Sequence, residues 1–195
     1  MRKTVGIIGS HQFIDGNTSQ RVAFIYPKVV AAMLDATPLV IPSMPETQDI
    51  GHLIEIFDGI VLTGGRANVH PRHWGEELTE AHGDIDEGRD AVALPLVRAC
   101  VDTGLPLFGS CKGFQEMAVA YGSSLHPEIR DLPGRMNHRM PRGDDVTREE
   151  IFRPRHKVDL LPGGIFAGLY GTTEIVVNSL HGQGIVDAGD RIVIE

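Results

Sequence analysis

The sequence contains little cysteine and no long hydrophobic run. Its two cysteines, Cys100 and Cys111, are too few for the disulfide framework of a small secreted protein, and favour a reducing cytoplasm. The apolar stretch near the N-terminus is too short for a secretory signal. No apolar run approaches the ~20 residues that cross a bilayer. We therefore expect a cytoplasmic protein with no membrane partner.

Clustered positive charge is also lacking. The chain has 18 Lys and Arg against 26 Asp and Glu, a net charge of −8, which argues against nucleic acid as a partner. Hydrophobic residues make up 42% and charged residues 23%, as in an ordinary globular protein. A length of 195 residues suits one domain with a sizeable core, so we expect a single domain over residues 1–195.

Short apolar runs alternate with helical patterns along the chain. Four runs are typical of strands covered on both faces of a parallel sheet, at residues 4–10, 38–43, 59–65 and 105–110. Helices are predicted from about Pro27, with Val30, Met33 and Leu34 facing inward, from about Asp86 to Thr103, and after Cys111. This alternation predicts an α/β fold with a doubly wound, mostly parallel sheet and helices on both faces.

The last third of the chain changes character. Residues 135–157 are charged and lack apolar periodicity, so they are predicted to form a long surface segment. Strand character resumes at residues 174–185 and 191–195.

Cys111 lies between two glycines where the predicted strand "PLFGS" gives way to a helix. Ligands of α/β sheets gather beyond the carboxyl ends of the strands. The pattern Gly109-x-Cys111-x-Gly113 has the form of a nucleophile elbow, in which bulkier neighbours would clash. The helix N-terminus would favour a thiolate and supply N–H donors. We therefore predict that Cys111 is a nucleophile rather than a small buried hydrophobe, the role that suits Cys100.

Three segments, in order, carry a resemblance to a known family. They are "GIVLTGGRANVHPRHWGEE", "DIDEGRDAVALPLVRACVDTGLPLFGSCKGFQEMAVAYGSSLHPEI" and "VNSLHGQGI". The chain resembles the class I glutamine amidotransferase-like superfamily, whose fold is flavodoxin-like. Within it, the segments look like the γ-glutamyl-γ-aminobutyrate hydrolase group of peptidase family C26.

This resemblance implies hydrolysis of γ-glutamyl amides, such as γ-glutamyl-γ-aminobutyrate, in polyamine or γ-aminobutyrate catabolism. Cys111 would attack the γ-carbonyl and form a thioester, with no cofactor or metal and a small γ-glutamyl substrate as the partner. The oxyanion would be held by backbone N–H groups of Lys112 and of the Gly64–Gly65 loop. Lys112 departs from the family's usual Arg, which changes any contact made by a guanidinium fork. Substrate contacts are predicted at Gln115, Asn178, Ser179 and His181.

The general base is the open question. The resemblance places the catalytic His and Glu in a late His-Pro-Glu segment, and the sequence stops at Glu195 before that segment is reached, so we expect the domain to lack it. His126-Pro127-Glu128 has the right letters but follows the nucleophile's helix, whose 11 residues rise roughly 16 Å, and is interpreted as a coincidence. His181 follows a predicted strand at the active edge. Substrate contact or loop structure is the main interpretation there, and service as the base is the alternative.

Two further groups of residues admit a structural interpretation. Three histidines near two aspartates could suggest a metal site, but their irregular spacing defines no geometry, so they are predicted to be solvated loop residues: His70, His73, His82, Asp84 and Asp86. Asp86, Arg89 and Asp90 match the family's Asp-x-x-Arg-Asp pattern. They are either a charge cluster that suits a helix N-terminus or substrate-recognition residues.

Two other functions remain open at this stage. One is a non-catalytic relative that binds a γ-glutamyl ligand, because no base is identified. The other is a glutaminase subunit that supplies ammonia to a synthase. A homodimer is one expectation, based only on how common dimers are among soluble enzymes.

Overall fold

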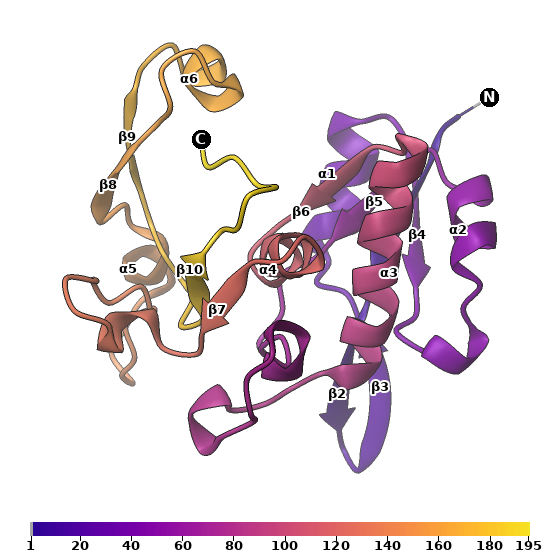
Figure 1. The fold of residues 1–195 in the computed structure, drawn as a ribbon, viewed down its shortest axis with the longest axis horizontal. Helices are drawn as coiled ribbons and strands as arrows, with labels where there is room; N and C mark the ends of the chain where they lie inside the picture. Colours follow the sequence, from indigo (N-terminus) through magenta and orange to yellow (C-terminus); the bar gives the residue numbers. More distant parts are fainter. Residues whose placement is uncertain (1) are drawn as a thin grey trace.

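The computed structural model describes residues 2–195 and has a four-stranded parallel sheet at its centre (Figure 1). The strands lie in the order β4 (Thr37–Ile41), β1 (Thr4–Ile8), β5 (Gly59–Leu62) and β6 (Leu107–Gly109). Each neighbouring pair is parallel, which confirms the predicted α/β architecture. The connection from β4 to β5 passes over β1, so the chain reverses direction across the sheet at β1 and β5, next to β6 and Cys111.

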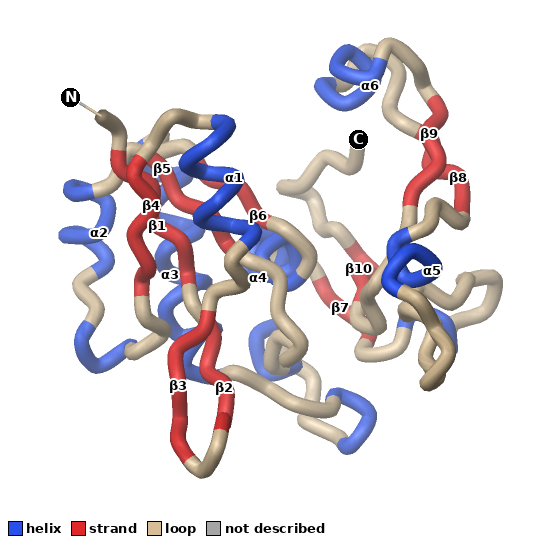
Figure 2. Tube along the Cα trace, turned by 180° about the vertical axis from the view of Figure 1, so that it is seen from behind, coloured by secondary structure: helices blue, strands red, loops and turns tan. Residues whose placement is uncertain are grey.

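Helices cover the two faces of this sheet. Side chains of β1 alternate between faces, so that Val5 and Ile7 pack with Val30 of α1 (Ile25–Met33), while Ile8 packs in the larger core on the other face. Helices α2 (Ile50–Ile56) and α3 (Glu87–Thr103) cover that second face, and Figure 2 shows α1 on the opposite one. Packed between these two hydrophobic layers, the sheet forms a rigid support for the candidate site.

The sheet is less completely covered than the apolar runs predict. Phe108 of β6 is 62% exposed, and Leu39 and Val40 of the edge strand β4 are also exposed. Phe108 is in register with Val61, which packs on the α1 side. Because the short helix α1 contacts mainly β4 and β1, it leaves the β6 end of that face open. The prediction of strands covered on both faces is therefore wrong for the two edge strands.

The predicted helices exist, with corrected details. Helix α3 begins after Asp86, whose side chain accepts the Arg89 N–H, and ends at Gly104 with φ +72°. Helix α1 begins at Ile25, so Pro27 is its third residue rather than its first. The inward positions predicted for Met33 and Leu34 are wrong, because only Val30 of this helix is buried.

The helix after Cys111, α4 (Lys112–Ala120), buries polar as well as apolar residues. Phe114 is half exposed, whereas Gln115 and Glu116 are buried. Polar groups lie inside here because each has a partner in the protein, as described below.

The rest of the chain forms small antiparallel pairs and short helices. The pairs are β2 (Ser10–Ile14) with β3 (Asn17–Arg21), β7 (Ser124–His126) with β10 (Gly184–Asp187), and β8 (His156–Asp159) with β9 (Glu174–Val177). Both views show β8 and β9 away from the central sheet (Figures 1 and 2). The short helices are α5 (Arg148–Phe152), α6 (Ile165–Tyr170), η1 (Pro45–Thr47), η2 (Pro71–Trp74), η3 (Glu80–His82) and η4 (Ile129–Asp131).

Two sequence expectations about the last third have different outcomes. Residues 135–157 form a mostly exposed segment that contains only α5 and the first residues of β8, in agreement with the prediction. The strand predicted at residues 191–195 is wrong, because these residues pair with no strand within the described part of the chain. Among residues 2–195, no helix combines the length and the apolarity needed to cross a bilayer.

Candidate functional site

Cys111 occupies the sharp turn between β6 and α4, and its backbone has φ +52° and ψ −109°. This conformation is unfavourable for any residue with a Cβ atom, and it is the backbone signature of a nucleophile elbow. The residue is exposed, in contrast to Cys100, which is buried in α3 and whose burial raises the pKa of its thiol to about 11. The chain therefore presents one accessible cysteine on a strained turn and keeps the other inert.

The flanking glycines are needed for steric reasons. A Cβ atom on Gly113 would lie 2.6 Å from the carbonyl carbon of Leu62 in β5. A Cβ atom on Gly109 would lie 2.7 Å from the backbone of Gly113 and 2.6 Å from the Met117 sulfur. Helix α4 can start directly over the ends of β5 and β6 only because both side chains are absent. The clash that the sequence pattern predicted is thus present, while the positive φ falls on Cys111 itself.

Two backbone N–H groups beside the turn have no acceptor. Gly64 lies against the elbow, since a Cβ atom on it would be 3.4 Å from the Cys111 Cβ. The Gly64 N–H donates to the Tyr26 hydroxyl at 2.7 Å, so it is already engaged. Within residues 2–195 the N–H groups of Gly65 and Lys112 donate to no protein acceptor. Of the three predicted oxyanion donors, these two remain available, and the Tyr26 hydroxyl beside the turn was not predicted from the sequence.

A buried ionic network lies behind the turn and explains the Asp-x-x-Arg-Asp pattern. Lys112 turns inward, with its Nζ 2.8 Å from Asp90 Oδ1 and 3.1 Å from the Asn68 carbonyl oxygen. Arg89 donates to both carboxylate oxygens of Glu116, at 2.8 and 2.9 Å. All four charged side chains are buried, and burial raises the pKa of Glu116 while Arg89 and Lys112 oppose that rise. These residues tie α3, α4 and the loop after β5 together.

Gln183 links the segment after β9 to the turn. Its side-chain oxygen accepts the Val69 N–H at 3.0 Å, and its carbonyl oxygen accepts the Gln115 amide at 2.7 Å. The same carbonyl oxygen lies 3.0 Å from His181 Nδ1. Gln115 is predicted as a substrate contact, but its side-chain amide nitrogen already donates a hydrogen bond within the protein. Gln183 was missed, although it is the glutamine of the "VNSLHGQ" motif.

Three histidines gather around Ser179. The Ser179 hydroxyl lies 2.9 Å from His138 Nδ1 and 2.5 Å from His156 Nε2, and the His138 ring stacks on His181 with centroids 4.8 Å apart. Burial is the main effect that lowers the pKa of both His138 and His181, so both favour the neutral ring. Asn178 makes no side-chain hydrogen bond in the described structure. No histidine of residues 2–195 hydrogen-bonds the Cys111 thiol, and His138 and His156 lie too far apart in sequence to be recognised as a group.

The remaining candidates have structural roles. His126 Nδ1 accepts the Glu128 N–H at 3.1 Å, and the Glu128 carboxylate pairs with Arg130 and Arg139. The prediction that His82 is solvated is wrong, because the side chain is buried and its Nδ1 accepts the Thr79 N–H at 3.1 Å. The same prediction is wrong for Asp86, which is buried at the N-cap of α3 and pairs with a histidine of β2. Within residues 2–195 no three His, Cys, Asp or Glu side chains are grouped to hold a metal ion.

Comparisons with known proteins agree on one family. The peptidase C26 family model matches residues 3–195. The γ-glutamyl-γ-aminobutyrate hydrolase PuuD of Escherichia coli (strain K12) is 30% identical over 98% of this chain and 74% of its own length. A putative glutamine amidotransferase-like protein, YvdE, of Lactococcus lactis is 29% identical over 96% of this chain and 78% of its own.

Solved structures with the same fold are more distant in sequence. A glutamine amidotransferase of Thermotoga maritima superimposes with a TM-score of 0.52 at 14% identity, and one of Methylobacillus flagellatus with 0.50 at 15%. The matches cover 97% and 96% of this chain but only 64% and 58% of the solved chains. The family match and the identity to the hydrolases, taken together, show that this chain is a member of the peptidase C26 family of hydrolytic enzymes.

Proposed function

We propose that the protein hydrolyses γ-glutamyl amides through a thioester on Cys111. The observation that carries this proposal is the strained, exposed position of Cys111 at φ +52°, between a parallel strand and a helix N-terminus. A cysteine with only a packing role would gain nothing from a conformation that costs a non-glycine residue of order 1–3 kcal/mol. The similarity to γ-glutamyl-γ-aminobutyrate hydrolases supplies the substrate class.

The chemistry divides into two displacements. The Cys111 thiolate attacks the γ-carbonyl carbon, the C–N bond breaks, and the amine leaves with a proton. Water then attacks the γ-glutamyl thioester, which releases glutamate and restores the thiol. The negative oxygen of each tetrahedral intermediate would be stabilised by the free N–H groups of Gly65 and Lys112. Loss of one such donor costs about 3 kcal/mol in related sites.

His181 is our candidate for the proton acceptor within residues 1–195. One of its ring nitrogens faces the Gln183 carbonyl oxygen and the other has no partner in the described structure. Burial lowers its pKa, so the ring is neutral and can accept a proton near neutral pH. A His181→Asn variant that keeps full hydrolysis would exclude this role. A raised KM with unchanged kcat would indicate a substrate contact instead.

The direct test compares the two cysteines as a matched pair. We expect the chain to release γ-aminobutyrate from γ-glutamyl-γ-aminobutyrate, Cys111→Ala to abolish the release, and Cys100→Ala to retain it. Binding of the substrate without turnover would favour the non-catalytic function, and faster hydrolysis of glutamine would favour a glutaminase. Light scattering of the same samples measures the mass of the particle in solution and so tests the expected homodimer. The proposed substrate implies a role in polyamine or γ-aminobutyrate breakdown in the cytoplasm.

A further inference from the structure

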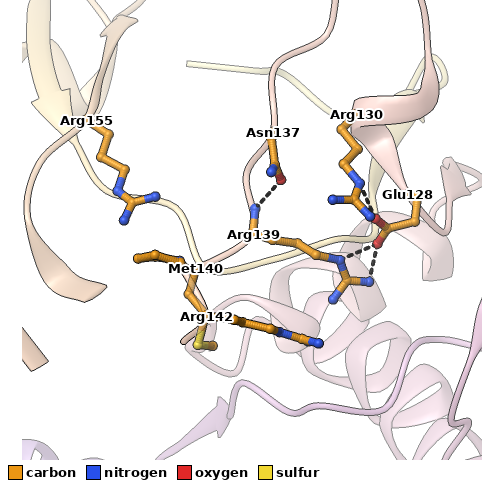
Figure 3. Close-up of a pocket in the computed structure, with 8 residues that line it drawn as sticks. Glu128, Arg130, Asn137, Arg139, Met140, Arg142 and Arg155 are labelled. Carbon is orange, nitrogen blue, oxygen red and sulfur yellow. Dashed lines mark hydrogen bonds and ion pairs between the residues drawn. The ribbon is translucent and has the colours of Figure 1, made fainter. Parts of the chain in front are cut away.

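A pocket of about 610 Å³ lies in the last third of the chain and is lined mainly by arginine (Figure 3). Arg130, Arg139, Arg142 and Arg155 contribute to its wall, and Glu128 is its only acidic lining residue. They come from η4, from the segment 135–157 and from the residue before β8, so the chain folds back on itself to bring them together. None of these residues belongs to the turn at Cys111.

Two of the four arginines form ion pairs with Glu128. The Arg130 Nε lies 2.8 Å from Glu128 Oε2, and Arg139 forms an ion pair with Glu128 Oε1. The hydrogen bond from Arg139 is the main effect that lowers the pKa of Glu128, so this carboxylate is charged at neutral pH. The Asp131 carboxylate also lies 3.8 Å from the Arg130 Nε, so two carboxylates balance these two guanidinium groups.

The other two arginines have no carboxylate partner. The Arg155 guanidinium donates only to the Glu150 carbonyl oxygen, at 3.1 Å, and the Arg142 side chain makes no hydrogen bond or ion pair within residues 2–195. The Glu150 carboxylate is occupied at the Thr147 cap, 2.8 Å from both the backbone N–H and the hydroxyl. The nearby acidic side chain does not therefore satisfy the free guanidinium groups.

This excess of positive charge is local. The whole chain has a net charge of −8, yet residues 135–157 contain seven Lys or Arg and four Asp or Glu. Like charges on neighbouring side chains repel, so the two arginines without a carboxylate partner lower the stability unless something negative offsets their charge. Arginine forks bind carboxylate and phosphate oxygens in pairs, with more geometric specificity than lysine.

The size and lining fit a small molecule rather than a macromolecular surface. Ligand pockets commonly measure about 300–1,000 Å³ and combine a few charged groups with apolar walls. Met140 and Pro141 supply an apolar part of this wall. We infer that the pocket binds a small polyanion, a molecule that carries a phosphate group or at least two carboxylates, between the paired arginines at Glu128 and the free arginines at positions 142 and 155.

The pocket is anchored to the candidate site through one glycine. A Cβ atom on Gly182 would overlap the Glu128–Arg139 pair, and the Gly182 carbonyl oxygen accepts the Ile129 N–H at 2.9 Å. Gly182 lies between His181 and Gln183 in the sequence. The polyanion site is thus a neighbour of the candidate site with its own set of side chains, and its occupancy does not require Cys111.

The test is titration calorimetry on the full chain with two probes, inorganic pyrophosphate and citrate. We expect saturable binding of at least one probe with a dissociation constant below about 1 mM, weakened by added salt. The double variant Arg142→Gln, Arg155→Gln should weaken it by at least about tenfold. The matched control, Arg21→Gln, removes an exposed arginine of β3 whose side chain hydrogen-bonds only to Gln12, and should bind as the wild type does. Cys111→Ser should also bind unchanged.

Each outcome decides something. Binding of pyrophosphate alone identifies a phosphate ligand, and binding of citrate alone identifies a polycarboxylate. The proposal is overturned if the double variant and the wild type bind the probes with equal affinity. It is also overturned if neither pyrophosphate nor citrate binds at about 10 mM. Circular dichroism of the double variant checks that a loss of binding is not a loss of fold, and a probe-induced rise in melting temperature, present in Arg21→Gln and absent in the double variant, gives a second readout.

Discussion

Replacing Cys111 with glycine should stabilise the protein while destroying its activity. The backbone of Cys111 has φ +52° and ψ −109°, which costs a residue with a Cβ atom about 1–3 kcal/mol. Glycine removes that cost but gives the unfolded chain more freedom, worth roughly 0.5–1 kcal/mol. The thiol is exposed and makes no hydrogen bond in the described structure, so its loss has little further effect. The expected net gain is about 1 kcal/mol.

Cys111→Ala is the matched comparison, because alanine removes the sulfur but keeps the Cβ atom and its strain. Urea unfolding of the two variants and the wild type measures the difference directly. For a chain of 195 residues, about 1 kcal/mol corresponds to a rise of roughly 2–4 °C in melting temperature. If the alanine variant is as stable as the glycine variant, the strain at the turn only matches the roughly 0.5–1 kcal/mol that glycine loses to the freedom of the unfolded chain. That is below the range expected for a strained nucleophile elbow and contradicts the reasoning.

Three further perturbations test the surroundings of the turn. Gly113→Ala should lower the free energy of unfolding by about 1–3 kcal/mol, because α4 must move off β5, whereas Gly168→Ala, with no heavy atom within 4 Å, should not. Lys112→Met should cost about 3–5 kcal/mol, because it leaves Asp90 buried without its cation. The free energy of unfolding should fall as the pH drops through about 6.5, because the unfolded chain protonates the imidazole of residue 181 more readily than the folded protein does, and His181→Asn should flatten that dependence.

Urea unfolding checks the first two of these, and the same measurement repeated between about pH 8 and pH 5 checks the third. Equal stability of the Gly113→Ala and Gly168→Ala variants would mean that α4 is not held against β5. A Lys112→Met variant as stable as the wild type would mean that the Lys112–Asp90 ion pair does not hold α3 and α4 together. An unchanged pH dependence in His181→Asn would assign the slope to other histidines.

The sheet was predictable because its strands are continuous apolar runs that end in Gly, Pro or Ser. The run at 191–195 has the same appearance and forms no strand, since an apolar pattern does not reveal whether a partner strand lies beside it. Met33 and Leu34 fit a helical stripe, yet they are exposed, because helix periodicity says nothing about how much sheet the helix meets. A local sequence pattern identifies the helices and strands, but it does not show how much of each is buried by neighbouring elements.

The candidate site was predictable only where its residues adjoin one another in sequence. Cys111 and its two glycines form a local pattern with a steric reason. The bonds from Ser179 to His138 and His156 span 41 and 23 residues, and nothing in the spacing indicates them. The arginine pocket escaped notice for the same reason, since residues 135–157 show only a charged surface segment until the chain folds around Glu128.

The most direct measurement is an acid quench during turnover of γ-glutamyl-γ-aminobutyrate, followed by mass spectrometry of the digested chain. A covalent cysteine route predicts a single γ-glutamyl group on the peptide that contains Cys111, and none on the peptide that contains Cys100. Hydrolysis that continues after Cys111 has been alkylated, or a chain that neither turns over nor acquires the adduct, would contradict it.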